Sequence, residues 1–96
     1  MRAYELMLII NPNLDEEALE AVIEKAKGLI TQGGGEITNV NKWGKRRLAY
    51  EIQDSTDGFY VVIDCNADNE TTKEVDRVLK ITEEVVRFLL VRKGDE

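Results

Sequence analysis

A short basic segment, residues 42–47, stands out in a chain whose formal net charge is −6. It contains four cationic side chains and one aromatic side chain: Lys42, Trp43, Lys45, Arg46 and Arg47. Arginine can bind phosphate through two parallel hydrogen bonds and can stack on bases. An aromatic ring beside cations suits base stacking or a protein contact. The segment therefore predicts a surface that binds a polyanion, with a nucleic acid as the first candidate.

Two other interpretations fit the same residues. Long cationic side chains protect the edge of a β-sheet from pairing with other chains, and lysine is often used in this way. A tryptophan can also fold over the end of a hydrophobic core instead of contacting a partner. Composition leaves these alternatives open for the basic segment and for Trp43.

Positive and negative charge are separated along the sequence. Residues 36–52 carry four cations and two acids, a balance of +2, and residues 85–93 carry three cations and no acid, a balance of +3. Residues 15–32 hold five acids and two lysines, and residues 66–84 hold six acids and three cations, so each balance is −3. Charges more than about 8 Å apart are largely screened at physiological salt, so the net charge does not exclude an anionic partner. The cations near the end of the chain are further binding candidates: Arg87, Arg92 and Lys93.

The residue types needed for several kinds of catalysis and metal binding are missing. The chain has no histidine, and its one cysteine, Cys65, lies in an apolar run. Zinc fingers, disulfide frameworks and histidine acid–base chemistry therefore have no support. Adjacent acids such as Glu16 and Glu17 do not converge on a helix, and no lysine follows the triple glycine 33–35 with phosphate-loop spacing. We predict a binding protein with no catalytic residue, no metal and no cofactor.

Length and hydropathy limit the organisation and the location of the protein. The 96 residues suffice for one small domain with a two-layer core, so we predict a single domain over residues 1–96. The chain has no apolar run of membrane-spanning length, and its N-terminal apolar run is too short for a signal peptide. A lone cysteine in an apolar run fits a reducing compartment. The sequence predicts a soluble cytoplasmic protein with no membrane partner.

Hydrophobic periodicity predicts four strands and two helices in the order β-α-β-β-α-β. The predicted strands are residues 3–10, 36–52, 59–65 and 85–93, and the predicted helices are residues 15–32 and 69–81, the second capped by Asp68 or Asn69. This order is typical of the ferredoxin-like fold, an α+β two-layer sandwich in which two helices cover one face of a four-stranded antiparallel sheet. Its first and third strands are central. The basic segment is therefore predicted to lie on an edge strand.

Alternation along the strands predicts which side chains face the core. On the long second strand, Ile37 and Val40 have opposite parity, which predicts a bulge or a bend between them. Gly44 is a second place where the strand can bulge or admit the backbone of a partner. The end of that strand carries three apolar residues of one parity: Leu48, Tyr50 and Ile52. The predicted core-facing residues of the first and third strands are Tyr4, Leu6, Leu8, Ile10, Phe59, Val61, Ile63 and Cys65.

The sequence closely resembles one family, protein six of the bacterial small ribosomal subunit, over essentially the whole chain. Four stretches carry the resemblance: Met1–Glu5, Asn11–Leu14, Trp43–Tyr50 and Gly58–Tyr60. The run WGKRRLAY is the specific part, whereas the other stretches are individually weak. Two features depart from the family pattern. Glu51 stands where many relatives have proline, and no long acidic tail follows.

The resemblance implies a structural ribosomal protein without catalytic activity. It implies that the chain binds the central domain of 16S ribosomal RNA as a heterodimer with protein eighteen of the same subunit. The exposed sheet and its edge would serve the protein partner. Transfer of family positions adds Arg2 to the candidates, and the predicted RNA-binding set is Arg2, Lys42, Trp43, Lys45, Arg46, Arg47, Arg87, Arg92 and Lys93.

Two other functions are compatible with this topology. A small-molecule-sensing regulatory module would need a ligand pocket at a dimer edge, and the cationic edge would favour an anionic metabolite. An acyl phosphatase would use an arginine and an asparagine to bind phosphate. Ligand-induced thermal shifts, homodimer formation and acyl phosphate hydrolysis distinguish these alternatives from a ribosomal protein.

Overall fold

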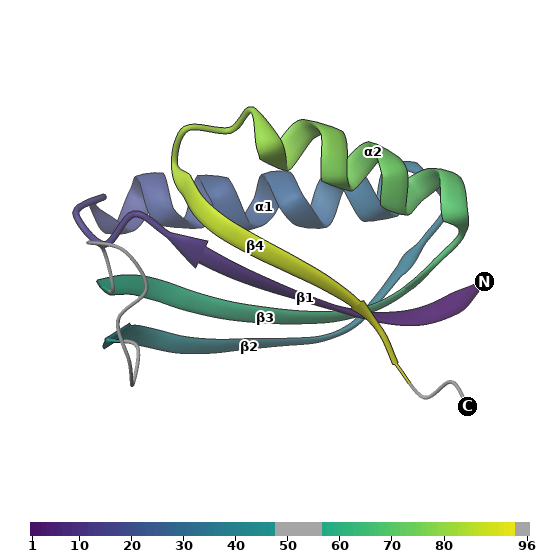
Figure 1. The fold of residues 1–96 in the computed structure, drawn as a ribbon, viewed down its shortest axis with the longest axis horizontal. Coiled ribbons are helices and arrows are strands. Elements are labelled where there is room, and N and C mark those ends of the chain that lie inside the picture. The colour runs from purple at the N-terminus through teal and green to yellow at the C-terminus, as the bar shows by residue number, and fades with distance from the viewer. Residues whose placement is uncertain (48–56, 94–96) are drawn as a thin grey trace.

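The computed structural model describes residues 1–47 and 57–93, of which residues 45–47 and 57 are described by their backbone alone. Six elements follow the predicted order (Figure 1). Their bounds are β1 Arg2–Ile10, α1 Glu16–Gln32, β2 Glu36–Arg47, β3 Asp57–Ala67, α2 Asn69–Lys80 and β4 Val85–Arg92. The predicted continuation of the second strand over residues 48–52, with its three apolar residues, lies outside the described residues. β3 is longer at both ends than the sequence predicts.

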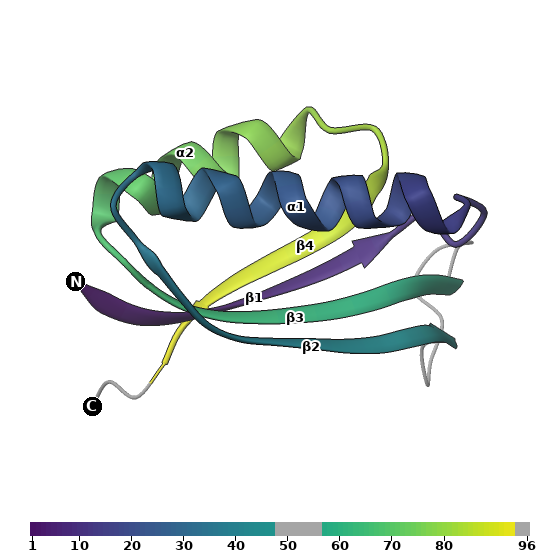
Figure 2. The same ribbon diagram turned by 180° about the vertical axis from the view of Figure 1, so that it is seen from behind.

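The four strands form one antiparallel sheet in the order β2-β3-β1-β4. Both helices lie on the same face of this sheet, as the views from the front and from behind show (Figures 1 and 2). This arrangement confirms the predicted ferredoxin-like fold. It also confirms that the second and fourth strands are the two edges, so the basic segment lies on an edge strand.

Each helix begins with an aspartate that caps its first turn. The side chain of Asp15 accepts a hydrogen bond from the Ala18 N–H at 2.8 Å, and Asp68 accepts one from the Thr71 N–H at 2.8 Å. The Thr71 hydrogen bonds hold the pKa of Asp68 below its usual value, because they favour the charged carboxylate. Of the two predicted caps for the second helix, Asp68 is therefore the residue that caps it.

The core lies between the helices and one face of the sheet. The predicted core residues Leu6, Leu8 and Ile10 of β1 are fully buried there, and Tyr4 packs against the core while partly buried. The residues of the buried cluster come from β1, β3 and both helices: Leu6, Leu8, Ile10, Leu19, Val22, Ile23, Ala26, Ile30, Val61, Ile63, Cys65, Val75 and Leu79. Phe59 packs against this cluster and is partly buried, so the predicted alternation of β3 is confirmed.

β2 is interrupted at two places where its register with β3 shifts. One shift lies between Ile37 and Asn39, and the other lies between Lys42 and Gly44. Gly44 has a φ of 88°, a conformation that glycine adopts without the strain of a side chain. The register is therefore interrupted at both places that the sequence indicates, and the second interruption lies within the basic segment.

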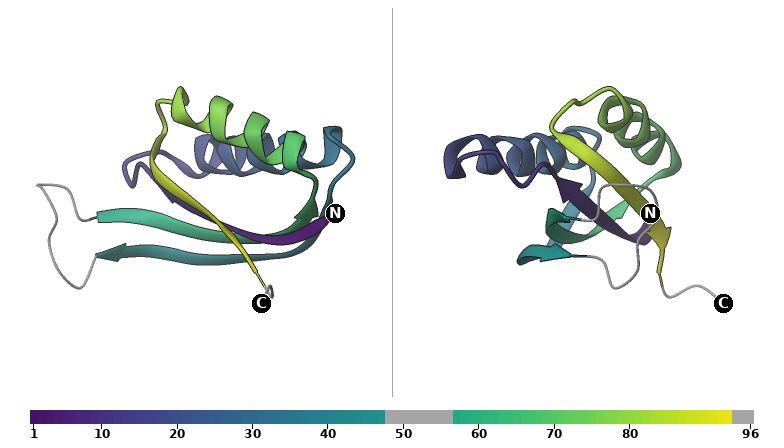
Figure 3. Two further views of the ribbon diagram at one scale, coloured as in Figure 1. Left: turned by 45° about the vertical axis from the view of Figure 1, so that its right-hand side comes forward. Right: turned by 60° about the vertical axis from the view of Figure 1, so that its left-hand side comes forward.

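The face of the sheet away from the helices, here called the open face, is not covered by either helix (Figure 3). Register places ten described residues of interest on it: Glu5, Met7, Ile9, Trp43, Tyr60, Val62, Asp64, Arg87, Leu89 and Val91.

Within the described ranges, neither helix has the length and apolar content needed to span a bilayer.

Candidate functional site

The basic segment occupies the last part of β2, where this strand pairs with the start of β3. Along the backbone, Lys45 is opposite Phe59, Arg46 is opposite Gly58 and Arg47 is opposite Asp57. The predicted position on a sheet edge is therefore confirmed for these cations. Their role in RNA binding remains a prediction.

Lys42 lies on the helical side of the sheet. It is opposite the core residue Val61, and its Nζ is 2.5 Å from Glu20 Oε2 of α1. Both side chains are about half exposed, and an ion pair of this kind contributes roughly 0–1 kcal/mol to stability. The ion pair therefore links β2 to α1, and Glu20 partly neutralises the charge of Lys42.

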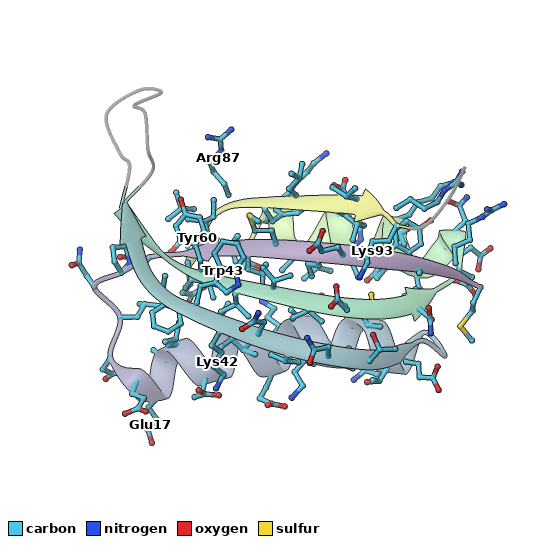
Figure 4. The ribbon with its side chains drawn as sticks, turned by 90° about the horizontal axis from the view of Figure 1, so that it is seen from below. Glu17, Lys42, Trp43, Tyr60, Arg87 and Lys93 are labelled. Atoms are coloured by element: carbon cyan, nitrogen blue, oxygen red, sulfur yellow. The ribbon has the colours of Figure 1, made fainter. Side chains whose placement is uncertain are left out.

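Trp43 lies on the open face, at the second bulge of β2. Its ring stacks on Tyr60 of β3, with centroids 6.3 Å apart and an interplanar angle of 7° (Figure 4). Trp43 is 41% exposed, whereas Tyr60 is 5% exposed and its hydroxyl finds no hydrogen-bond partner among the described residues. Trp43 is not a member of the helix-covered core. Trp43 therefore combines a stacking contact on the sheet with partial exposure to solvent.

The open face is apolar towards the end that carries Trp43. Tyr60 is opposite Ile9, Val62 is opposite Met7, and Met7 is opposite Leu89 of β4. Leu89 is 58% exposed, so this part of the sheet presents an apolar side chain to solvent. Val91, which is 43% exposed, extends the apolar surface along β4 to the position opposite Glu5. Exposed apolar side chains that adjoin one another are typical of a protein-binding surface.

The other end of the open face is polar. Glu5 and Asp64 are opposite each other there, and Asn66 Nδ2 donates a hydrogen bond to Glu36 Oε1 at 3.3 Å. Lys93 Nζ is 3.1 Å from Asp64 Oδ1, which forms an ion pair across the sheet. The sheet layer is therefore not uniformly cationic, and the charge separation along the sequence is only partly a separation in space.

The structure divides the predicted RNA-binding residues into two groups. Arg2 is opposite Ala67, Arg92 is opposite Tyr4, and the Lys93 N–H donates to the Ala3 carbonyl at 2.8 Å, so these three cations share one end of the sheet. Arg87 is opposite Ile9, near the other end, and Figure 4 shows it on the opposite side of Trp43 and Tyr60 from Lys42. The second group is Lys42, Trp43, Lys45, Arg46, Arg47 and Arg87.

Sequence reasoning did not include four open-face residues among the site residues. They are Met7, Tyr60, Leu89 and Val91. Strand parity is the sequence signal that indicates such residues. Leu89 and Val91 alternate with Phe88 and Leu90 along an apolar strand. A sheet that is covered on only one face must expose one of these two sets. Packing explains why residue 58, one of the positions that carry the family resemblance, is a glycine. A Cβ at this position would clash with Cγ2 of Ile9.

Titratable groups within the described ranges do not form a catalytic or metal-binding arrangement. No group of three or more histidine, cysteine or acidic side chains in those ranges could hold a metal ion. Burial raises the pKa of the Cys65 thiol, and the nearby Asp64 charge raises it further, which makes the reactive thiolate less accessible. The geometry instead favours surface recognition by cations and apolar side chains.

Comparisons with known proteins agree with this description. The family model described as ribosomal protein S6 matches residues 3–92. The small ribosomal subunit protein bS6 of Carboxydothermus hydrogenoformans is 48% identical over 93 residues, covering 97% of each chain. The bS6 protein of Desulfitobacterium hafniense is 45% identical over 95 residues, covering 99% of this chain and 100% of the relative.

A solved structure gives the same result for the fold. The crystal structure of 30S ribosomal protein S6 from Thermotoga maritima superposes with a TM-score of 0.87 at 35% sequence identity, covering 96% of this chain and 87% of that chain. Proteins of this family belong to the ribosome in the bacterial cytoplasm, which is the location that the sequence resemblance implies. The chain belongs to the ribosomal protein S6 family of the small ribosomal subunit.

Proposed function

We propose that this protein is a structural, noncatalytic component that binds the central domain of 16S ribosomal RNA together with ribosomal protein eighteen. One observation carries the proposal: an exposed apolar sheet face is flanked at both ends by cations. Apolar area suits a protein neighbour, and cations suit phosphates. A surface that combines the two fits a protein held between RNA and another protein.

The RNA-binding part of the proposal rests on the nine predicted residues. Cations that neutralise phosphates give affinity and orientation without reading sequence. The helical segments, each with a charge balance of −3, form the layer on the other side of the molecule and would face away from RNA. The expected contact set remains Arg2, Lys42, Trp43, Lys45, Arg46, Arg47, Arg87, Arg92 and Lys93.

The RNA role of the basic segment is tested by the double substitution Arg46→Ala and Arg47→Ala. Filter binding to a central-domain RNA fragment in the presence of protein eighteen should show weaker affinity. The slope of log K against log salt should fall by about 0.9 for each phosphate that is no longer neutralised, or by about 0.7 on single-stranded RNA.

The matched control removes the same number of charges from the exposed helical layer through Lys25→Ala and Lys73→Ala. This control should change neither the affinity nor the slope by a comparable amount. If the arginine variant binds with unchanged affinity and slope, these arginines do not contact RNA.

The protein-binding role of the open face is tested with Trp43, the single tryptophan of the chain. A protein that covers the half-exposed ring should shift its fluorescence emission to shorter wavelength, whereas stacking of a base on it should quench the emission. A blue shift on titration with protein eighteen, before any RNA is added, would assign Trp43 to the protein interface, whereas quenching on addition of RNA would support its place in the RNA contact set. Formation of the heterodimer without a change in emission would exclude Trp43 from the interface.

A further inference from the structure

The outer edge of β4 presents backbone hydrogen-bonding groups that no strand of the sheet pairs. β4 is the last strand in the order β2-β3-β1-β4. The Lys93 N–H donates to the Ala3 carbonyl of β1, which turns the backbone groups of Lys93 and of alternate residues before it towards β1. In the regular part of the strand, the N–H and C=O groups of Phe88 and Leu90 therefore point outward.

A groove runs along this edge, between β4 and α2. Its volume is about 510 Å³, and its lining comprises Asp76, Leu79 and Lys80 of α2 with residues 85–90 of β4. Lys80 Nζ is 3.1 Å from Asp76 Oδ2, so these two charges on its α2 side are paired with each other. Leu79 is fully buried, whereas Phe88 and Leu90 are only partly buried. The groove could therefore accept apolar side chains from a chain running beside β4.

β4 has few of the devices that prevent strand addition: two arginines, and one register shift at its start, where Ile9 and Ile10 pair with Arg87 and Val85. Its register with β1 is regular from Arg87 to Arg92, and its sequence VVRFLLVR contains no proline, glycine or lysine. Leu89 and Val91 project their exposed side chains from the open face of the same edge. A long apolar edge of this kind favours pairing with an extended polypeptide.

Charge selects among the possible extended chains. Residues 85–93 carry three cations and no acid. Arg87 is exposed and has no ion pair or hydrogen bond within the described part of the chain. Two copies of β4 side by side would place like charges next to each other, which is unfavourable. A segment with a carboxylate beside Arg87 would instead form an ion pair.

We propose that an extended segment of a protein partner adds to the outer edge of β4 as a fifth strand. Its backbone pairs with Phe88 and Leu90, alternate apolar side chains enter the groove beside α2, and a carboxylate lies against Arg87. This inference rests on the proposed function, because it describes how the protein partner of the ribosomal complex docks. It adds the main-chain edge and the chemistry of the docking segment, and it moves Arg87 from the expected RNA contact set to the protein interface.

Amide hydrogen exchange tests strand addition directly. The full chain, labelled for NMR, is measured alone, then with ribosomal protein eighteen, and then with a central-domain RNA fragment added. The Phe88 and Leu90 amides should exchange rapidly in the free protein and slow by about tenfold or more with protein eighteen, as expected for new backbone hydrogen bonds. The outward amides of β2 should not change to this extent.

Three substitutions test the side-chain part of the proposal. Leu89→Lys places a cation on the edge, Arg87→Glu reverses the charge there, and Ile81→Lys is the control, since Ile81 is 72% exposed but precedes the strand. The first two should weaken binding of protein eighteen by about tenfold or more, whereas the control should stay within about twofold. All three should keep the thermal midpoint of the free protein nearly unchanged, because the residues are exposed.

The possible outcomes distinguish this inference from the proposed function. If the complex with protein eighteen and RNA forms but the Phe88 and Leu90 amides remain unprotected, strand addition is wrong and the proposed function stands. Protection that appears only when RNA is added assigns the edge to RNA and also overturns the inference. If Arg87→Glu weakens RNA binding alone, its carboxylate contact is wrong. If protein eighteen forms no complex at all, the proposed function fails and the inference fails with it.

Discussion

The two edges of the sheet differ in how readily they can pair with another strand. β2 is interrupted by two register shifts, has a glycine at positive φ, and ends in the basic segment. β4 runs in regular register from Arg87 to Arg92 and is largely apolar. Bulges and cations discourage pairing with another strand, whereas a regular apolar edge invites it. One sheet can therefore resist strand pairing at the edge suited to a polyanion and allow strand pairing at the edge suited to a polypeptide.

The largest expected effect comes from breaking β4 on its inner side. Leu89→Pro removes an N–H that points to β1 and leaves the Met7 carbonyl without its ladder partner. We expect the free energy of unfolding to decrease by about 2 to 4 kcal/mol, measured by urea denaturation. The matched variant Leu89→Lys keeps the backbone bond and should change stability by less than about 0.5 kcal/mol. Equal destabilisation by both variants would contradict the assigned direction of the backbone groups.

The next effect concerns the second bulge of β2. Gly44→Ala would place a side chain on a residue with a φ of 88°, although its Cβ would meet no atom within 4 Å. The expected cost is therefore backbone strain of about 1 to 2 kcal/mol, measured by thermal or urea unfolding. Gly28→Ala is the control, because it lies inside α1 and should be neutral or slightly stabilising. A neutral Gly44→Ala would mean that the bulge does not depend on glycine.

The bulges show how much of the fold follows from sequence periodicity. Opposite parity of Ile37 and Val40 predicts the first bulge, and the isolated Gly44 predicts the second, since both signals are local. The core faces of β1 and β3 are predicted for the same reason. The helices, strands and core faces therefore follow from residues that are near one another in the chain, whereas the strand order follows from the order of the elements, which is typical of the ferredoxin-like fold.

The contacts of the candidate site are harder to predict because they join distant residues. Lys42 pairs with Glu20 and Trp43 stacks on Tyr60, and both contacts depend on the register and twist of the assembled sheet. The sequence places Tyr60 on the outer side of β3 but gives no sign that the ring is buried there. Charge counts by segment also miss Glu5 and Asp64 on the open face.

A smaller effect tests whether Arg87 opposes pairing of β4 with a second copy of itself. Arg87→Val removes an exposed cation from the edge and makes the strand more apolar. Sedimentation velocity should then show a coefficient that rises with protein concentration, because the charge repulsion between two edges is reduced. Arg77→Val removes an exposed arginine from α2 instead and should not increase the concentration dependence of the sedimentation coefficient. Self-association of both variants would point to a general solubility effect instead of an edge effect.

The smallest effect concerns the link between β2 and the helical layer. Lys42→Ala removes the ion pair with Glu20, and a double-mutant cycle with Glu20→Ala should give a coupling energy of about 0.2 to 1 kcal/mol. The coupling should decrease in high salt, since both side chains are about half exposed. If Lys42 also contacts phosphate, Glu20→Ala should strengthen RNA binding, because it frees the ammonium group from its acidic neighbour. A coupling energy near zero together with unchanged RNA affinity in both single variants would leave Lys42 as a residue that only protects the edge of β2.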